Sequence, residues 1–239
     1  SGPTFNPTKL SGLVLWLDAQ DDSTFTLDTS NVSNWRDKST GGNDAVPVAD
    51  HVPMRVTSAA VGKPVVHFAG DQALTVADHP SLHFGTDDLL VAVVANWTSR
   101  GGLFLKIDDT NVSKPGIAML PTSSTAMCWA IDNVCRAFQN DAGTLSTAFH
   151  TYIGVRSNGG TTETLYVDGT QVRQDMIDGM VDATNSRPLY LGADRVNTSV
   201  LVNPITADVG EILAYSGAGV ADPARVTQLD SYLRTRWGF

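Results

Sequence analysis

Long apolar runs, glutamate and cysteine are all scarce in this sequence of 239 residues. The longest apolar run, Leu89 to Ala95, has the length of a strand and is far shorter than the roughly 20 residues that a membrane-spanning helix needs, so we expect a soluble protein. Only two of the 25 acidic residues are glutamates, Glu163 and Glu211. Because aspartate favours turns and helix caps whereas glutamate favours helices, most of the acidic residues are expected in turns.

Cysteine occurs twice, at Cys128 and Cys135 within the segment CWAIDNVC. A short hairpin loop at Asp132 and Asn133 would place the two thiols face to face on adjacent strands, where a disulfide can form. Two buried free thiols explain the sequence equally well. The spacing does not match a zinc knuckle and the five histidines are scattered, so a zinc site is not expected.

Charged residues make up 17 % of the chain and hydrophobic residues 42 %, a balance typical of a folded protein with neutral polar loops. The formal net charge is −9. An acidic surface disfavours nucleic acid and anionic membranes as partners, because both repel it.

The aspartates have two interpretations. Turn chemistry explains most of them, yet clustered Asp and Asn oxygens with nearby carbonyls also supply the about six to eight hard ligands that calcium takes. No cluster matches an EF-hand loop. The hypothesis of a structural or ligand-bridging Ca²⁺ rests on three groups: Asp71 with Asp78, Asp87 with Asp88, and Asp108 with Asp109 and Asn111.

Short segments rich in β-branched and aromatic residues recur along the whole chain, separated by Gly, Asn, Asp and Ser clusters. So many short strands predict an all-β sandwich of two antiparallel sheets. The expected strands are Leu13 to Leu17, Val65 to Phe68, Leu74 to Val76, Leu89 to Asn96, Leu103 to Ile107, Gly116 to Leu120, Met127 to Ile131, Val134 to Phe138, His150 to Arg156, Thr162 to Val167, Gln171 to Gln174, Leu189 to Gly192 and Val209 to Tyr215. The stretches 40–62 and 175–187 are expected to be irregular.

Two local signals stand out within this pattern. In LYVDGTQV, Asp168-Gly169 lies between two strand-like runs and readily supplies the positive φ angles of a tight hairpin turn. A helix is predicted over 222–237, where Asp222 can cap and Pro223 can occupy the first turn. Its buried face is expected to carry Val226, Leu229, Leu233 and Trp237.

Six segments form an ordered pattern along the chain: LSGLVLWLDAQD, NWRDKSTGGNDAV, KPVVHFAGDQAL, LYVDGTQV, LYLGAD and the closing VGEILAYSGAGVADPARVTQLDSYLRTRWGF. Taken together they resemble the bacterial and phage LamG-like jelly-roll family of the concanavalin A-like lectin/glucanase superfamily. Where the family often has Phe-Asp-Gly, this chain has Ala69 after Phe68. The resemblance runs from about Leu10 to Phe239 and implies a jelly roll of two curved antiparallel sheets, with ligand-binding loops at one rim or along the concave face.

The resemblance leaves function open, since this sandwich serves lectins, adhesins, virion proteins and glycan-cleaving enzymes. A retaining glycosidase on this fold usually carries Glu-x-Asp-x-x-Glu on one strand, which this sequence lacks. A lyase would need a His or Tyr base with an Arg or Lys, for which His67, His150, Tyr152 and Arg156 are the available side chains, but each lies in an ordinary strand pattern.

Sugar binding needs an aromatic platform flanked by hydrogen-bonding groups. Trp97 with Arg100, and Trp129 with Asp132, Asn133 and Arg136, are the leading candidate contacts, although the strand pattern favours burial of both indoles in the sandwich.

Together these observations predict one domain over 10–239, preceded by a tail over 1–9 whose Ser1-Gly2-Pro3 is consistent with a cleavage scar. We expect a non-catalytic glycan-binding or adhesion domain of a secreted, cell-surface or phage fibre protein, with a polysaccharide or cell-surface glycan as its partner. Two alternatives stay open: a structural jelly roll of a virion or surface fibre that packs against protein subunits, and a polysaccharide hydrolase or lyase.

Overall fold

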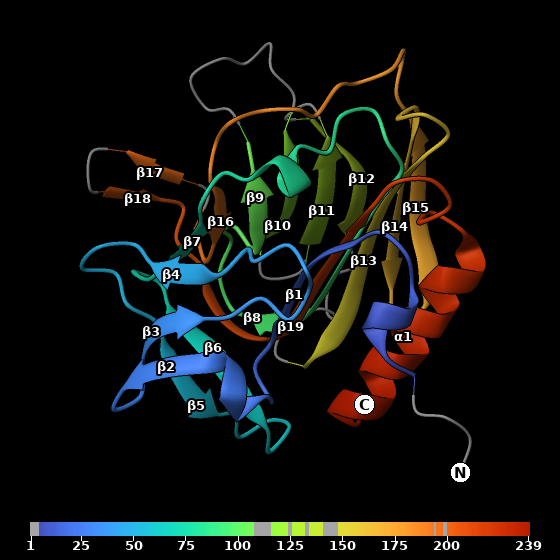
Figure 1. Ribbon diagram of the computed structural model, residues 1–239. Helices are drawn as coiled ribbons and strands as arrows, with labels where there is room; N and C mark the ends of the chain where they lie inside the picture. The colour runs from blue at the N-terminus through green and yellow to red at the C-terminus, as the bar shows by residue number, and fades with distance from the viewer. Residues whose placement is uncertain are drawn as a thin grey trace.

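The computed structural model describes residues 5–107, 116–123, 126–131, 134–140, 148–193, 195–197 and 200–239. Nearly all of its regular structure is antiparallel strand, and one α-helix closes the chain (Figure 1). The elements are η1 (Pro7–Lys9), β1 (Leu13–Asp18), η2 (Asp22–Thr24), β2 (Phe25–Asp28), β3 (Asn31–Trp35), β4 (Ala45–Pro47), β5 (Met54–Thr57), β6 (Pro64–Ala69), β7 (Leu74–Val76), η3 (Pro80–Leu82), β8 (Leu89–Trp97), β9 (Phe104–Lys106), β10 (Ile117–Ser123), β11 (Ala126–Ile131), β12 (Val134–Asn140), β13 (His150–Ser157), β14 (Thr162–Val167), β15 (Thr170–Met176), β16 (Leu189–Leu191), β17 (Arg195–Asn197), β18 (Val200–Val202), β19 (Thr206–Ser216) and α1 (Pro223–Trp237).

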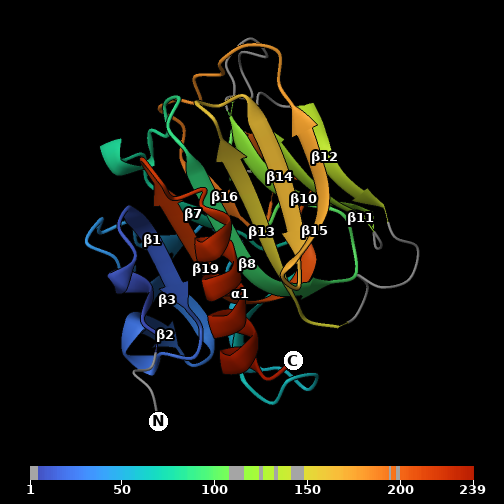
Figure 2. The same ribbon diagram turned by 90° about the vertical axis from the view of Figure 1, so that its right-hand side faces the viewer.

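The strands form two facing layers. One layer has the order β1, β19, β8, β13, β14 and β15, with β6 replacing β1 beside the first half of β19 and β5 continuing from β6. The other has the order β4, β7, β16, β9, β10, β11 and β12. β3 pairs with β2, β4 and β5 and so joins the layers. Figure 2 shows β13, β14 and β15 in front of β10, β11 and β12. The predicted two-sheet antiparallel sandwich is confirmed.

The core between the layers is built on aromatic rings. The rings of Trp97 and Tyr152 lie 4.9 Å apart, and both side chains are fully buried. Trp129 packs against Gly154 so closely that a Cβ at that glycine would come within 2.3 Å of the indole. The indole N–H groups of Trp97 and Trp129 donate to the carbonyls of Ser123 and Val155, at 3.1 and 3.2 Å. Their polar edges are therefore satisfied inside the sandwich.

The predicted C-terminal helix is present as α1. The Asp222 side chain accepts from the Ala224 N–H at 2.9 Å, which caps the first turn, and Pro223 follows it. The helix ends at Gly238, whose φ of 82° suits a left-handed cap. The expected face is buried against the β19 and β13 side of the first layer: Val226, Leu229, Leu233 and Trp237 are each at most 2 % exposed. No helix in the described ranges is long and apolar enough to cross a membrane.

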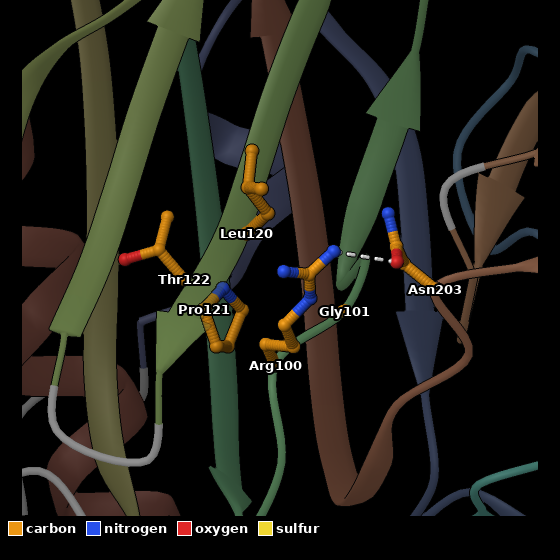
Figure 3. Close-up of a pocket in the computed structure, with 6 residues that line it drawn as sticks. All are labelled: Arg100, Gly101, Leu120, Pro121, Thr122 and Asn203. Carbon is orange, nitrogen blue, oxygen red and sulfur yellow. Dashed lines mark hydrogen bonds between the residues drawn. The ribbon is translucent and has the colours of Figure 1, made fainter.

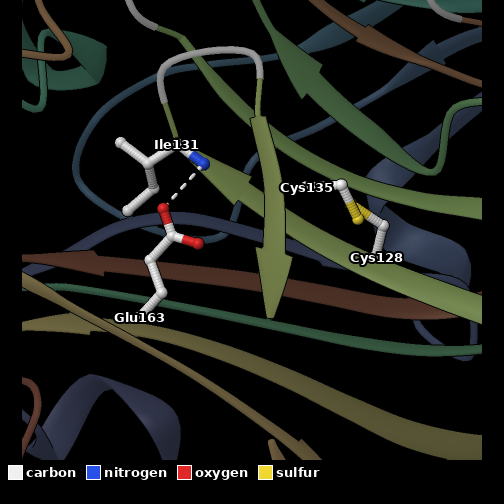
Figure 4. The surroundings of a disulfide bond; sticks show 4 residues. All are labelled: Cys128, Ile131, Cys135 and Glu163. Carbon is white, nitrogen blue, oxygen red and sulfur yellow. Dashed lines mark hydrogen bonds between the residues drawn. A yellow bond between two sulfur atoms is a disulfide. The ribbon is translucent and has the colours of Figure 1, made fainter. Parts of the chain in front are cut away.

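Cys128 and Cys135 form a disulfide across the β11–β12 hairpin, with Cα atoms 5.7 Å apart (Figure 4). The sequence left the choice between a disulfide and two free thiols open. Nearby, the Glu163 carboxylate on β14 accepts from the Ile131 N–H at 3.1 Å, which ties the end of β11 to the opposite layer.

The sequence did not predict β2, β3, β4 or β5, which lie at the edge where the layers join. Two of these strands, β4 and β5, fall in the stretch 40–62 that was expected to be irregular. The reason is composition. Strand β3 contains Asn31, Ser33 and Asn34, and such polar residues lack the β-branched and aromatic side chains that indicate a strand. The second expected irregular stretch contains no regular element after β15 ends at Met176. In the expected tail, Phe5 packs against Tyr232 of α1, with ring centroids 5.2 Å apart.

Candidate functional site

A groove with a volume of about 370 Å³ lies on the outer face of the first layer, between β13, β14 and β15 and the turn that leads into α1. Alternation along β14 places Leu165 and Val167 in the core, so Thr164 and Tyr166 point to the opposite face, where the groove lies. The lining residues are Asp88, Val155, Ser157, Asn158, Thr164, Tyr166, Gln171, Gln174, Gly219, Ala221, Asp222 and Pro223.

A β-bulge in β15 brings two glutamines to this groove. Gln174 pairs with Thr164, whereas Gln171 pairs with Tyr166, and the register shifts between these pairs. Residues three apart on a regular strand face opposite sides, but the extra residue of the bulge, Val172, restores them to one side. Cross-strand partners share a face, so both glutamines flank the tyrosine. The preceding turn, Asp168-Gly169, has φ angles of 48° and 75°, as predicted for this hairpin.

The chemistry of the groove is that of an apolar ring surrounded by neutral hydrogen-bonding groups. Burial raises the pKa of the half-buried Tyr166, which keeps the phenol uncharged. The Gln171 amide N–H donates to the Gln174 amide oxygen at 3.3 Å, which leaves the Gln171 oxygen and the Gln174 amide nitrogen for a ligand. Asp88 and Asp222 are the charged residues of the lining, which contains neither Lys nor Arg.

A second pocket, of about 190 Å³, contains the predicted site residue Arg100 (Figure 3). Its walls come from the turn after β8, from β10 and from the segment between β18 and β19. The exposed guanidinium of Arg100 donates from Nη2 to Oδ1 of Asn203 at 2.7 Å. Leu120, Pro121 and Thr122 line the opposite wall, and Gly101 completes the pocket.

The other predicted ligand contacts are not at a surface or lie outside the description. Trp97 and Trp129 are both 0 % exposed, which corrects the expectation that they form sugar platforms. Trp97 reaches Ser123 and Trp129 reaches Gly154, each in the opposite layer, so both rings lie between the layers. Asp132 and Asn133 lie outside the described residues. Arg136 lies in the described backbone of β12, and its side chain is outside the description.

Among the described calcium candidates, Asp78 has other partners at its carboxylate, whereas Asp71, Asp87 and Asp88 accept hydrogen bonds at their backbone carbonyls. The Asp78 carboxylate contacts Nζ of Lys106 at 2.8 Å and Nε2 of His83 at 3.0 Å, so two side chains of the protein already occupy it. The backbone carbonyls of Asp71 and Asp87 accept from His51 and Arg156, at 2.7 and 2.9 Å.

Asp88 accepts through its carbonyl from the Gly217 N–H at 3.0 Å. Asp108, Asp109 and Asn111 lie outside the described residues. Among the residues that the structure describes, no three His, Cys, Asp or Glu side chains gather as a metal site. Calcium binding therefore stays a prediction that this geometry does not strengthen.

A carboxylate with a strongly raised pKa lies elsewhere, beneath α1. Burial, aided by the nearby charge of Asp18, raises the pKa of Glu211 to about 7. Nε of Arg236 lies 3.3 Å from the Glu211 carboxylate and its Nη2 lies 2.7 Å from Asp18, which also contacts Nζ of Lys38 at 2.8 Å. Both acidic side chains are 0 % exposed, so a polysaccharide chain has no access to them, and the cluster joins α1 to β1 and β19.

Sequence reasoning missed Tyr166, Gln171 and Gln174. Their strands were predicted, and the signal was present in the segment LYVDGTQVRQ, where polar and aromatic residues mark one face of a hairpin. The bulge in β15 and the wall supplied by 219–223 were not visible in the sequence, because they depend on contacts between distant segments.

No family model matches the sequence, and no curated protein matches it. Solved structures with a similar fold exist. The binding domain of Paraclostridial Mosquitocidal Protein 1 has a TM-score of 0.64 and 12 % identity, covering 92 % of this chain and 52 % of that one. Domain 4 of AbnA, an extracellular arabinanase from Geobacillus stearothermophilus solved with arabinotriose, has a TM-score of 0.62 and 11 % identity, covering 92 % and 98 %. The Trypanosoma rangeli sialidase solved with sialic acid has a TM-score of 0.64 and 12 % identity, covering 94 % and 33 %.

This chain therefore spans about half of the toxin binding domain and a third of the sialidase. At these identities the similarity establishes the fold alone, an antiparallel β-sandwich. The narrower assignment to the LamG-like family stays a prediction.

Proposed function

We propose that this chain is a non-catalytic glycan-binding domain of a secreted or surface-exposed protein, and that the groove around Tyr166 holds a neutral glycan. The observation that carries the proposal is the grouping of one half-buried tyrosine ring with Thr164, Gln171 and Gln174 on a single face. A pyranose presents apolar C–H faces and equatorial hydroxyls, so it needs an aromatic surface together with amide and hydroxyl partners.

The charges of the groove favour a neutral ligand. Asp88 and Asp222 would repel a carboxylated sugar, and carboxylates accept well from sugar hydroxyls. The fold is compatible with this role, since the arabinanase domain was solved with arabinotriose. The disulfide between Cys128 and Cys135 supports an oxidising compartment, as expected for a secreted protein.

A glycan array probed with the whole chain, followed by calorimetric titration of the strongest neutral glycan, tests the proposal. We expect Tyr166→Ala to weaken binding at least tenfold, which corresponds to about 1.4 kcal/mol, and Gln174→Ala to weaken it less. Arg173→Ala is the matched control, because Arg173 lies on the same strand, is exposed and does not line the groove. An array without neutral hits, or equal affinities for the wild type and Tyr166→Ala, would contradict the proposal.

A further inference from the structure

Arg100 carries a guanidinium that the described residues do not neutralise. Its Nη2 donates to the neutral amide oxygen of Asn203, and no carboxylate in the described part of the chain lies within ion-pair distance of it. Arg55, Arg173 and Arg236, by contrast, each contact a carboxylate. The protein has a net charge of −9, yet the positive charge of Arg100 has no acidic partner in the described residues and is available to an anionic ligand.

The local backbone builds this arrangement. Gly101 has a φ of 149°, and a Cβ there would lie 2.7 Å from the Asn203 carbonyl oxygen and 2.8 Å from Cβ of Ile205. Only a glycine lets the segment before β19 approach so closely, and this approach places Asn203 beside Arg100. Asn203 itself has a left-handed φ of 46°, which asparagine tolerates better than most residues. The Gly101 N–H donates to the Pro121 carbonyl at 3.0 Å, which fixes the facing wall.

The pocket combines this cation with a small apolar wall. Figure 3 shows the Arg100 guanidinium between Asn203 on one side and Leu120 and Pro121 on the other, with Thr122 beside them. The planar fork of an arginine matches a carboxylate or a sulfate through paired N–H donors. At about 190 Å³ the pocket is smaller than a typical small-molecule site of roughly 300–1,000 Å³, so it suits one ring or one substituent of a larger glycan.

We propose that the Arg100 pocket is a second ligand site, which binds an anionic sugar residue through its carboxylate or sulfate group. The glycan nature of this ligand rests on the function proposed above, whereas its anionic nature rests on Arg100. The pocket shares no lining residue with the Tyr166 groove, and the two differ in charge, since the groove contains Asp88 and Asp222. A glycan with neutral and acidic units can therefore contact the domain at two places.

Titrations of the whole chain, followed by NMR, with methyl glucuronide, a 6-sulfated methyl galactoside and methyl glucoside test this site. We expect the glucuronide or the sulfated sugar to bind at least tenfold more tightly than the glucoside at the Arg100 pocket, and the stronger of the two identifies the anion. Arg100→Ala should remove this preference, and Arg100→Lys should restore it in part, because an ammonium keeps the charge without the fork.

Arg173→Ala and Tyr166→Ala are the controls, and both should retain the preference for the acidic sugar. Equal binding of the acidic sugars to the wild type and Arg100→Ala would overturn the second site, as would equal binding of acidic and neutral sugars to the wild type. The two proposals are tested independently. Weaker binding of the neutral glycan to Tyr166→Ala supports the groove, whatever the result for Arg100→Ala. Loss of the preference for the acidic sugar in Arg100→Ala supports the pocket, whatever the result for Tyr166→Ala.

Discussion

The indole N–H of Trp237 donates to Oε2 of Glu211 at 3.0 Å and so joins the last turn of α1 to β19. Two further donors meet the same carboxylate at Oε1: the Trp16 indole at 2.8 Å and the Tyr232 hydroxyl at 3.0 Å. Donors from α1 and β1 thus converge on one buried acid of β19. Because hydrogen bonds are electrostatically stronger in the protein interior than in water, this cluster should contribute substantially to the attachment of the helix.

The Trp237 hydrogen bond can be tested by Trp237→Phe, which keeps an aromatic ring and removes the donor. We expect the free energy of unfolding to fall by about 1–3 kcal/mol, the usual cost of leaving a buried acceptor without one partner. Chemical denaturation measures it. Trp35→Phe is the matched control: Trp35 is buried like Trp237, but its indole nitrogen has no hydrogen-bond partner among the described residues. Equal losses in the two variants would show that ring volume, not the hydrogen bond, is responsible.

Glu211 predicts the direction of a pH effect. Its pKa is raised from 4.5 to about 7 in the folded protein, so the folded state holds this proton more tightly than the unfolded state. The resulting stability is complete below about pH 4.5 and is lost as the pH rises through 7. Denaturation between pH 5 and pH 8, values chosen to lie around this window, should show a decrease that is flatter in Glu211→Gln. Equal pH dependence of the free energy of unfolding in the wild type and in Glu211→Gln would contradict this role of Glu211.

At the acidic end, the opposite effect comes from Asp21. Hydrogen bonding to Lys38 lowers the pKa of Asp21 from 3.8 to about 2. Its contribution to stability is present above pH 3.8 and is lost as the pH falls through 2, which separates it from the Glu211 window.

Contact between Gly154 and Trp129 makes the core sensitive to a single methyl group. Gly154→Ala would place its Cβ 2.3 Å from the indole, and we expect a loss of roughly 1–3 kcal/mol or more from overpacking. Trp129→Leu removes the indole that the new methyl group would contact. The double variant should therefore lose less stability than the sum of the losses of the two single variants. Strict additivity in this double-mutant cycle is the result that rules out the contact.

The disulfide closes a short loop, with a sequence separation of 7 between its cysteines. Replacing Cys128 and Cys135 together by alanine should lower the free energy of unfolding by about 2–3 kcal/mol, because the unfolded chain gains conformational freedom. Adding a reductant to the wild type should reproduce the loss and should leave the double variant unchanged. A wild-type protein indifferent to the reductant would contradict this expectation.

The sequence predicted the strands and the helix that carry a clear hydrophobic pattern, either a periodic apolar face or a continuous apolar run. In α1 the cap Asp222, Pro223 and the face ending at Trp237 agree, and in β8 a continuous apolar run marks a strand buried on both faces. Strand β3 was not predicted, because three of its five residues, Asn31, Ser33 and Asn34, are polar and give no hydrophobic signal.

The site was harder to predict for a different reason. The polar residues that follow Trp97 and Trp129 in the sequence suggest exposed rings. Which side of a strand is exposed depends on where the opposite layer lies, and both indoles face inward. Arg100 lies in a turn, where no layer covers it, and it lines a surface pocket. Tyr166 becomes a candidate only when β13, β15 and the 219–223 turn are assembled around it.

The central claim, that the Tyr166 groove binds a neutral glycan, is tested most directly by recording the side-chain amide resonances of Gln171 and Gln174 while the strongest neutral array hit is added. We predict saturable shifts of both amides, with the same dissociation constant as the calorimetric titration, and none in Tyr166→Ala. Binding that leaves both amides unshifted in the wild type would place the glycan elsewhere and contradict the account.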